Sequence, residues 1–350
     1  MSDKKLRFAM FGTGNFGPFF AKYINEVAEL VAICDPSPEA MARFVESTKL
    51  KVLEFTDCQQ LLDSVEVDAV ALTGPNHTHK AIAIEAAKTG AHVFCEKMMA
   101  LTVPDCWEMV RACEAAKVRL MVGQKRRLRP PWARMIQLRD VLGPVVAIST
   151  VGYFEEVFHG WWARKAQSGG LLACSGVHEL EWMRAMCGDV ATVSAISAPQ
   201  IDARYDFADS IHVSLQYRSG AIGFLGVSLS YPLKKYRQAY GAEVICRDGG
   251  MRLVTSIQHA DLHWRLSSEL IDHQERFEET GGNPIGAEEA LRREVREFVR
   301  WVTHGTPPTL TWEQGLRCVE IIEAAHRSAT EAGKWMHLPL YPDLEWKRSS

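Results

Sequence analysis

Three glycines near the start of the chain constrain its fold more than any other feature. Gly12, Gly14 and Gly17 follow directly on the apolar segment 6–11 and precede an amphipathic stretch that begins at residue 16. A strand that turns through closely spaced glycines into a helix is typical of the first unit of a parallel β-α-β arrangement. The beginning of the chain therefore predicts a parallel α/β sheet.

The same alternation continues through the first third of the chain. Short apolar segments alternate with stretches whose apolar residues recur at helical spacing. Strands are expected at residues 6–11, 30–34, 68–72, 92–95 and 119–122, and helices at 16–27, 38–47, 78–89 and 103–116. Because strands that are apolar on both faces alternate with helices, we expect a doubly wound parallel sheet, the Rossmann architecture.

The pattern changes after Gly123. Longer strand-like segments follow one another with few helices between them, at residues 146–154, 193–196, 211–217, 222–230, 243–247 and 262–266. Turns are expected at 218–220 and 248–250, and helices at 287–302 and 312–331. This order predicts an α+β domain with a large, mostly antiparallel open sheet. Since 350 residues are too many for one ordinary core, we expect a Rossmann domain at 1–124 and a second domain at 125–350.

Composition excludes several classes of partner. Lys and Arg total 40 against 43 Asp and Glu, and the net charge of -3 gives no general attraction to nucleic acid or anionic membrane. No stretch is long enough to span a bilayer, and the first residues lack the apolar segment of a signal peptide. Nine cysteines without CxxC spacing, and His77 and His79 without a third ligand nearby, predict neither disulfides nor a metal site. We expect a cytoplasmic protein that acts on a small molecule.

The glycine turn predicts a dinucleotide cofactor. Its first glycine permits the tight turn, the second lets a pyrophosphate approach the backbone, and the third allows close packing, while the helix N-terminus attracts the anion. Asp35 ends the second strand, where a carboxylate binds the adenosine ribose and repels a 2′-phosphate, which favours NAD over NADP. Two plainer interpretations stay open: the turn binds nothing, or Asp35 caps the helix that begins near Pro36. The expected cofactor turn comprises Gly12, Thr13, Gly14, Asn15, Phe16 and Gly17.

Further segments carry a family resemblance. Residues 75–79 read PNHTH, residues 91–97 read AHVFCEK, and residues 168–178 read SGGLLACSGVH. They resemble the PNxxH, HVxxEKP and GGGxLxDxGxH motifs of the Gfo/Idh/MocA oxidoreductases, named for glucose-fructose oxidoreductase, inositol dehydrogenase and a rhizopine catabolism protein. Residues 122–128, VGQKRRL, resemble the family's crossover between domains. The resemblance spans nearly the whole chain and implies an NAD-dependent enzyme acting on a sugar or polyol.

The resemblance also implies roles for single residues. Lys97 is expected near the nicotinamide and the substrate hydroxyl, where a cationic amine stabilises a developing alkoxide. His178 is expected to be the general base, since an imidazole titrates near neutral pH. The plainer alternatives are a surface Lys97 beside a solvated or structural Glu96, and a packed or helix-capping His178. The other residues expected on the cofactor side are Thr73, Pro75, Asn76, His79 and Glu96.

The chain departs from the family pattern at three positions. Cys174 replaces the aspartate that the family places four residues before the histidine, and we expect a small apolar residue in the same space rather than a charge. Met98 replaces the proline after Lys97. The Lys97 backbone is therefore expected to sit differently, because a non-proline cis peptide bond costs about 3 kcal/mol. Glu181 stands where a second aspartate is common and is expected to position its neighbours.

Substrate contacts are expected from an aromatic segment and a basic one. Trp161 and Trp162 offer an apolar face for a sugar ring, and His159 or Arg164 can hydrogen-bond hydroxyls. The alternative is two core tryptophans beside a solvated arginine. The basic run 125–129 is expected to face the cleft or solvent rather than nucleic acid. The expected substrate residues are Arg126, His159, Trp161, Trp162, Arg164, Cys174 and His178.

Three functions follow as hypotheses. The first is an NAD-dependent dehydrogenase that oxidises a secondary hydroxyl of a sugar, glycoside or inositol. The second is a redox-neutral NAD-dependent glycosidase, in which transient oxidation at C3 is followed by elimination and hydride return. The third is a non-catalytic NAD-binding regulator. The resemblance further implies that the second domain binds substrate and forms a homodimer or homotetramer through the open face of its sheet, for which the alternating strand at 211–217 is a candidate.

Overall fold

The chain forms two compact units in a computed structural model that describes residues 5–154, 158–230, 238–255, 259–278 and 286–344. The first unit contains the described residues up to Gln124 together with 288–316. The second contains those of 125–287 and those from Arg317 onward. No helix within the described ranges is long and apolar enough to cross a membrane.

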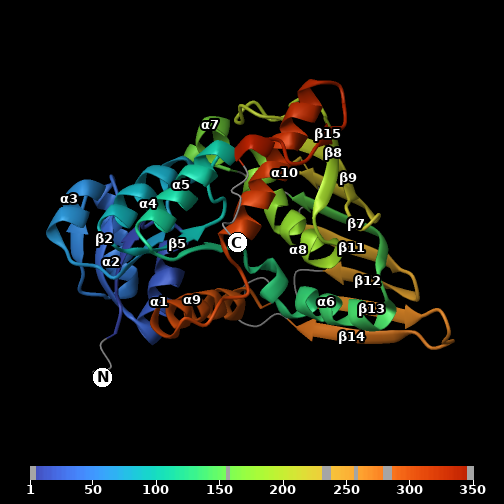
Figure 1. The fold of residues 1–350 in the computed structure, drawn as a ribbon, viewed down its shortest axis with the longest axis horizontal. Coiled ribbons are helices and arrows are strands. Elements are labelled where there is room, and N and C mark those ends of the chain that lie inside the picture. The colour runs from blue at the N-terminus through green and yellow to red at the C-terminus, as the bar shows by residue number, and fades with distance from the viewer. Residues whose placement is uncertain (1–4, 155–157, 231–237, 256–258, 279–285, 345–350) are drawn as a thin grey trace. The chain divides into compact units, whose positions relative to one another are not determined.

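A six-stranded sheet forms the centre of the first unit (Figure 1). Its strands are β1 (Arg7–Phe11), β2 (Glu29–Cys34), β3 (Leu53–Phe55), β4 (Ala69–Leu72), β5 (His92–Glu96) and β6 (Leu120–Gly123). They are all parallel and lie in the order β3-β2-β1-β4-β5-β6. The predicted doubly wound sheet is confirmed. The sequence did not reveal β3, because three residues are too few to display an alternating pattern.

Helices cover this parallel sheet, and one of them comes from far along the chain. They are α1 (Gly17–Val27), α2 (Pro38–Thr48), α3 (Cys58–Ser64), α4 (His79–Lys88), α5 (Val103–Ala115) and α9 (Ala287–His304). The ring of Phe94 on β5 meets Phe20 of α1 and Phe298 of α9 edge-on, with centroids 5.4 and 5.6 Å apart. Aromatic packing therefore anchors α9 in the core of the first unit.

A nine-stranded sheet dominates the second unit, in the order β14-β13-β12-β11-β7-β10-β9-β8-β15. Its strands are β7 (Val145–Phe154), β8 (Val190–Ser197), β9 (Ser210–Tyr217), β10 (Ile222–Ser228), β11 (Gln238–Cys246), β12 (Gly249–Thr255), β13 (His259–Leu266), β14 (His273–Glu278) and β15 (Met336–His337). Only the β10–β7 pair is parallel among these, which confirms the mostly antiparallel sheet. The turn expected at 248–250 is wrong in part, since Gly249 already begins β12.

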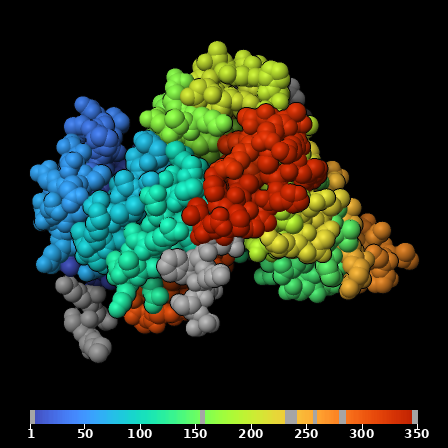
Figure 2. Space-filling view, turned by 45° about the horizontal axis from the view of Figure 1, so that its top comes forward, coloured from blue at the N-terminus to red at the C-terminus, as the bar shows by residue number. Residues whose placement is uncertain are grey.

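Helices pack on one face of this sheet. They include α6 (Pro130–Leu142) and α8 (Val177–Cys187), which Figure 1 shows beside the strands. The unit also contains α7 (Lys165–Ser168) and most of α10 (Trp312–Thr330). The opposite face leaves Ile196, Ile222 and Ile245 exposed. At the end of this sheet β15 pairs with β8, and Figure 2 shows red C-terminal residues against yellow and yellow-green ones.

Candidate functional site

The glycine turn between β1 and α1 leaves open space at its centre. Gly12 has φ +102°, and a Cβ there would lie 2.4 Å from the Gly74 nitrogen, so only glycine fits. A Cβ on Gly14 would meet no atom within 4 Å. Helix α1 has no side-chain cap at Phe16 and no acidic residue in its first turn. This arrangement fits a pyrophosphate, which needs close backbone approach and an uncapped helix N-terminus.

Asp35 directs its carboxylate towards the glycine turn. Its Oδ2 accepts hydrogen bonds from the Thr13 backbone nitrogen at 2.9 Å and from Thr13 Oγ1 at 3.0 Å, while Oδ1 accepts from the Ser37 nitrogen at 3.0 Å. Helix α2 is capped by Ser37, whose Oγ accepts from the Ala40 nitrogen. The alternative that Asp35 caps this helix is therefore wrong. The half-buried carboxylate fits a ribose-binding role beside the turn.

The turns after β4 and β5 are tied together by His79. Its ring is fully buried, with Nδ1 2.7 Å from the Met98 carbonyl oxygen and Nε2 3.1 Å from that of Gly74. Burial lowers the pKa of this imidazole. Thr73 Oγ1 donates to the Gly12 carbonyl oxygen at 2.7 Å, which joins the β4 turn to the glycine turn. Buried Asn76 lies in the short 3₁₀ turn Asn76–Thr78 of the same connection.

Lys97 is buried directly after the end of β5. Only 7% of it is exposed, so the surface-lysine alternative is wrong. Glu96 is equally buried, and its Oε2 accepts from the Lys97 backbone nitrogen at 3.1 Å. The peptide bond between Lys97 and Met98 is cis. This bond is cis although methionine replaces the family proline. The expectation that the Lys97 backbone sits differently is therefore wrong.

Two buried ion pairs join the basic segment to α8 in the second unit. Arg126 is 4% exposed; its Nη2 lies 2.7 Å from Glu179 Oε1 and its guanidinium 4.6 Å from the Trp132 ring centroid. Arg127 pairs with the fully buried Glu181, whose pKa is raised by burial. Carboxylates of α8 hold both side chains, which leaves Arg126 buried and Arg127 half-buried rather than fully solvated, and contact of Arg126 with a substrate stays a prediction.

His178 lies in the first turn of α8, directly after a π-helical turn at Leu172–Gly176. The His178 side chain is half-buried, whereas Cys174 in the π-helical turn is 5% exposed. Cys174 Sγ lies 4.0 Å from the Trp162 carbonyl oxygen. The buried thiol is consistent with the expected small apolar residue. Widened π turns inside α-helices are frequent at functional sites, so this position suits a catalytic base.

The aromatic segment before α7 forms a stack. The rings of Trp161 and Trp162 have centroids 4.4 Å apart at 31°, and Trp162 contacts Phe158 at 5.6 Å. Both tryptophans are half-buried, so they are neither fully core nor fully exposed. His159 and Arg164 are exposed, and Arg164 Nη1 donates to the Arg204 carbonyl oxygen at 3.1 Å. The predicted substrate role of these side chains stays a prediction.

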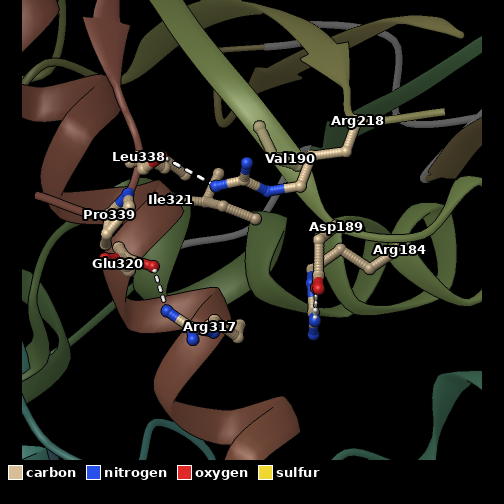
Figure 3. Close-up of a pocket in the computed structure, with 9 residues that line it drawn as sticks. All are labelled: Arg184, Asp189, Val190, Arg218, Arg317, Glu320, Ile321, Leu338 and Pro339. Carbon is tan, nitrogen blue, oxygen red and sulfur yellow. Dashed lines mark hydrogen bonds and ion pairs between the residues drawn. The ribbon is translucent and has the colours of Figure 1, made fainter. Parts of the chain in front are cut away.

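A separate small cavity in the second unit is lined by Arg184, Arg218 and Arg317 (Figure 3). It measures about 50 Å³. Arg184 pairs with Asp189, Arg317 Nη1 lies 2.9 Å from Glu320 Oε2, and Arg218 Nη2 donates to the Leu338 carbonyl oxygen at 3.0 Å. Each guanidinium thus faces an oxygen of the protein itself, and none of the predicted site residues lines the cavity.

The sequence prediction missed Gly74 and Glu179. Gly74 lies where a Cβ of Gly12 would collide, and a glycine two residues after the β4 segment was the available signal. Glu179 follows His178 and holds Arg126. The sequence contains two adjacent arginines, Arg126 and Arg127, and two glutamates, Glu179 and Glu181, of complementary charge. Which arginine pairs with which glutamate becomes clear only from the fold.

Comparison with known families gives two matches that together cover most of the described chain. Residues 6–124 match the model of an oxidoreductase family with an NAD-binding Rossmann fold. Residues 133–252 match the Gfo/Idh/MocA C-terminal domain. These matches confirm the predicted family, NAD as the cofactor and an oxidoreductase as the class of enzyme.

Individual relatives differ in reaction. A 2,7-anhydro-N-acetylneuraminate hydratase of Escherichia coli is 30% identical over 65% of this chain, and the chain spans only 63% of the hydratase. A myo-inositol 2-dehydrogenase of Thermotoga maritima is 24% identical over 93% of this chain and 97% of its own. The crystal structure of a Caulobacter crescentus aldose-aldose oxidoreductase with glycerol superimposes with a TM-score of 0.80 at 25% identity, covering 96% of this chain and 100% of that one.

Proposed function

Because the chain belongs to the Gfo/Idh/MocA family of NAD-binding oxidoreductases, we propose that it oxidises a secondary hydroxyl of a sugar, glycoside or inositol. The observation that carries this proposal is the buried Lys97 directly after the carboxyl end of β5. Ligands gather at the carboxyl ends of parallel strands in doubly wound sheets. NAD, when bound, supplies the hydride acceptor.

In this proposal Lys97 and His178 have separate roles in the oxidation. The half-buried imidazole of His178 removes the hydroxyl proton as the C–H bond breaks. The cationic amine of Lys97 stabilises the negative charge that develops on the oxygen. Burial of Lys97 strengthens this electrostatic effect, because less water surrounds the charge.

The substrate class is supported by the aromatic stack and by the relatives. Half-buried Trp161 and Trp162 present ring surface suited to the C–H face of a pyranose or cyclitol. Exposed His159 and Arg164 offer donors for surrounding hydroxyls. Named relatives include a myo-inositol dehydrogenase and an aldose-aldose oxidoreductase. A polyhydroxylated ring is the substrate that suits all of these features.

The direct test measures reduced cofactor. Purified protein with NAD is offered a panel of aldoses, inositols and glycosides, and Lys97→Met and His178→Asn are compared with wild type. We expect kcat/KM to fall about 10²- to 10⁴-fold in each variant. Lys80→Met, at a half-exposed lysine paired with Asp105, and His212→Asn, at an exposed histidine, are the matched controls. A wild type that reduces no NAD across the panel contradicts the dehydrogenase proposal, and full activity in both variants contradicts the assigned residues.

A redox-neutral reaction is the second candidate. It is favoured by Cys174, a thiol where the family pattern has a carboxylate, and by the relatives named as hydratases, since addition of water gives no net oxidation. Chromogenic aryl glycosides separate the two reactions. Release of the aglycone without accumulation of NADH supports transient oxidation and elimination, whereas accumulation of NADH supports the dehydrogenase.

A further inference from the structure

Two cysteines meet at the carboxyl end of β2, in the cofactor-binding sheet. Cys34 is the last residue of β2 and Cys58 the first residue of α3, and their Sγ atoms lie 3.6 Å apart. Both are free thiols in the structure. A disulfide needs an S–S distance of about 2.05 Å, so the sulfur atoms have to approach by roughly 1.5 Å. This approach requires rotation of the side chains or a shift of the backbone.

The two thiols differ in exposure. Cys34 is 2% exposed, whereas Cys58 is half-buried. Either thiol can donate the hydrogen bond between the sulfur atoms. Because attack requires access to the oxidant, the more exposed Cys58 is suited to attack an oxidant from solvent and Cys34 to resolve the product.

We propose that Cys34 and Cys58 form a reversible disulfide that weakens NAD binding. With a low-molecular-weight disulfide such as glutathione disulfide as oxidant, the Cys58 thiolate attacks one sulfur and releases one glutathione thiolate. Cys34 then loses its proton and attacks the Cys58 sulfur of the mixed disulfide, releasing the second glutathione. Two protein thiols are oxidised and one glutathione disulfide is reduced to two thiols.

The coupling to NAD passes through Asp35. Asp35 directly follows Cys34, its backbone nitrogen donates to the Phe55 carbonyl oxygen, and its carboxylate holds Thr13 in the glycine turn. Drawing Cys34 towards α3 therefore displaces the carboxylate that is expected to bind the adenosine ribose. The inference depends on that role of Asp35 and not on the identity of the substrate.

Peptide mapping tests disulfide formation. The protein is incubated with glutathione disulfide, free thiols are alkylated, and the chain is digested with trypsin. Cys34 and Cys58 fall in separate tryptic peptides, residues 23–43 and 52–80, each of which contains a single cysteine. We expect a linked 23–43/52–80 peptide in wild type and in the control Cys246→Ser, and none in Cys58→Ser. Absence of the linked peptide from wild type overturns the proposal.

Fluorescence titration with NADH tests the coupling. Oxidised wild type is expected to bind NADH roughly tenfold more weakly than reduced protein, with recovery after dithiothreitol. Cys58→Ser, at the half-buried position, is expected to bind equally well before and after oxidant treatment. A linked peptide without a change in NADH affinity overturns the coupling. Neither measurement uses substrate, so both outcomes are independent of the proposed dehydrogenase reaction.

Discussion

Gly12 and Gly14 serve different purposes although they share one turn. Gly12 has a positive φ, which residues with a side chain rarely adopt. A Cβ at Gly12 would also collide with the backbone of Gly74. Gly14 is exposed and has free space around it. The first glycine is therefore required by the fold, and the second by the approach of a ligand.

This difference predicts opposite results for two alanine variants. Gly14→Ala is expected to keep the wild-type melting temperature but to bind NADH about tenfold or more weakly, because the methyl group occupies the space of the pyrophosphate. Gly12→Ala is expected to lose about 1–3 kcal/mol of unfolding free energy or more. Thermal denaturation and NADH titration of both variants separate the effects. Unchanged NADH affinity in Gly14→Ala contradicts binding at this turn.

At the scale of elements, ion pairs fasten α8 to the 3₁₀ turn Lys125–Leu128. Arg127 and Glu181 are 54 residues apart in sequence, and the Glu181 side chain is fully buried. A buried carboxylate is tolerated only when it is paired, since its desolvation is costly. The same helix begins at the π-helical turn and carries His178, so these pairs also hold the candidate base in place.

Arg127→Ala is expected to destabilise the second unit by about 3–5 kcal/mol at pH 7, because Glu181 is left buried and unpaired. The raised pKa of Glu181 means that the folded state holds a proton at pH values where the unfolded state has lost it. Stability of this variant is therefore expected to increase as the pH falls from 7 to 5. Denaturant titrations at both pH values measure the effect.

The matched control is the double variant Arg127→Met/Glu181→Met. It removes both charges with little change in volume and is expected to recover most of the lost stability. Its unfolding free energy should differ from wild type by a similar amount at pH 7 and pH 5. A loss in Arg127→Ala that is equally large at both pH values would speak against an ionised, unpaired Glu181 as its cause.

At the scale of the whole molecule, one face of the nine-stranded sheet exposes large apolar side chains. Ile222 of β10 and Ile245 of β11 both align with Ala147 of β7, so the three form one row across the sheet. The two isoleucines are 57% and 60% exposed. The outward residues of β9, such as His212 and Ser214, are polar, so the exposed isoleucines lie on β10 and β11 rather than on the predicted strand.

A homo-oligomer formed through this face is expected to dissociate when the row is charged. Ile222→Lys/Ile245→Lys should lower the native mass measured by size-exclusion chromatography with light scattering, because lysines are costly to bury in an apolar interface. Ile201→Lys is the control, since Ile201 is 74% exposed outside the strands of the same unit. A native mass that is unchanged in the double variant places the interface elsewhere.

The elements predicted from sequence were those with strong local patterns. Buried parallel strands such as β1 and β4, and the amphipathic helices around them, carry their apolar periodicity within a few residues. Helix α6 and strand β14 were missed. Two prolines begin α6, and β14 reads HQERFE with alternate residues exposed, so neither segment displays a clear apolar period.

By itself, the sequence determined the doubly wound sheet, the glycine turn and the preference for NAD, because each depends on residues within one turn or one strand-to-helix connection. Only the tertiary structure decided that Lys97 is buried, that Arg127 pairs with Glu181, and that Cys34 meets Cys58 across 24 residues. These features depend on segments that lie apart along the chain, and local sequence patterns do not specify how close such segments come in space. Their energies depend on burial, which is a property of the packed molecule.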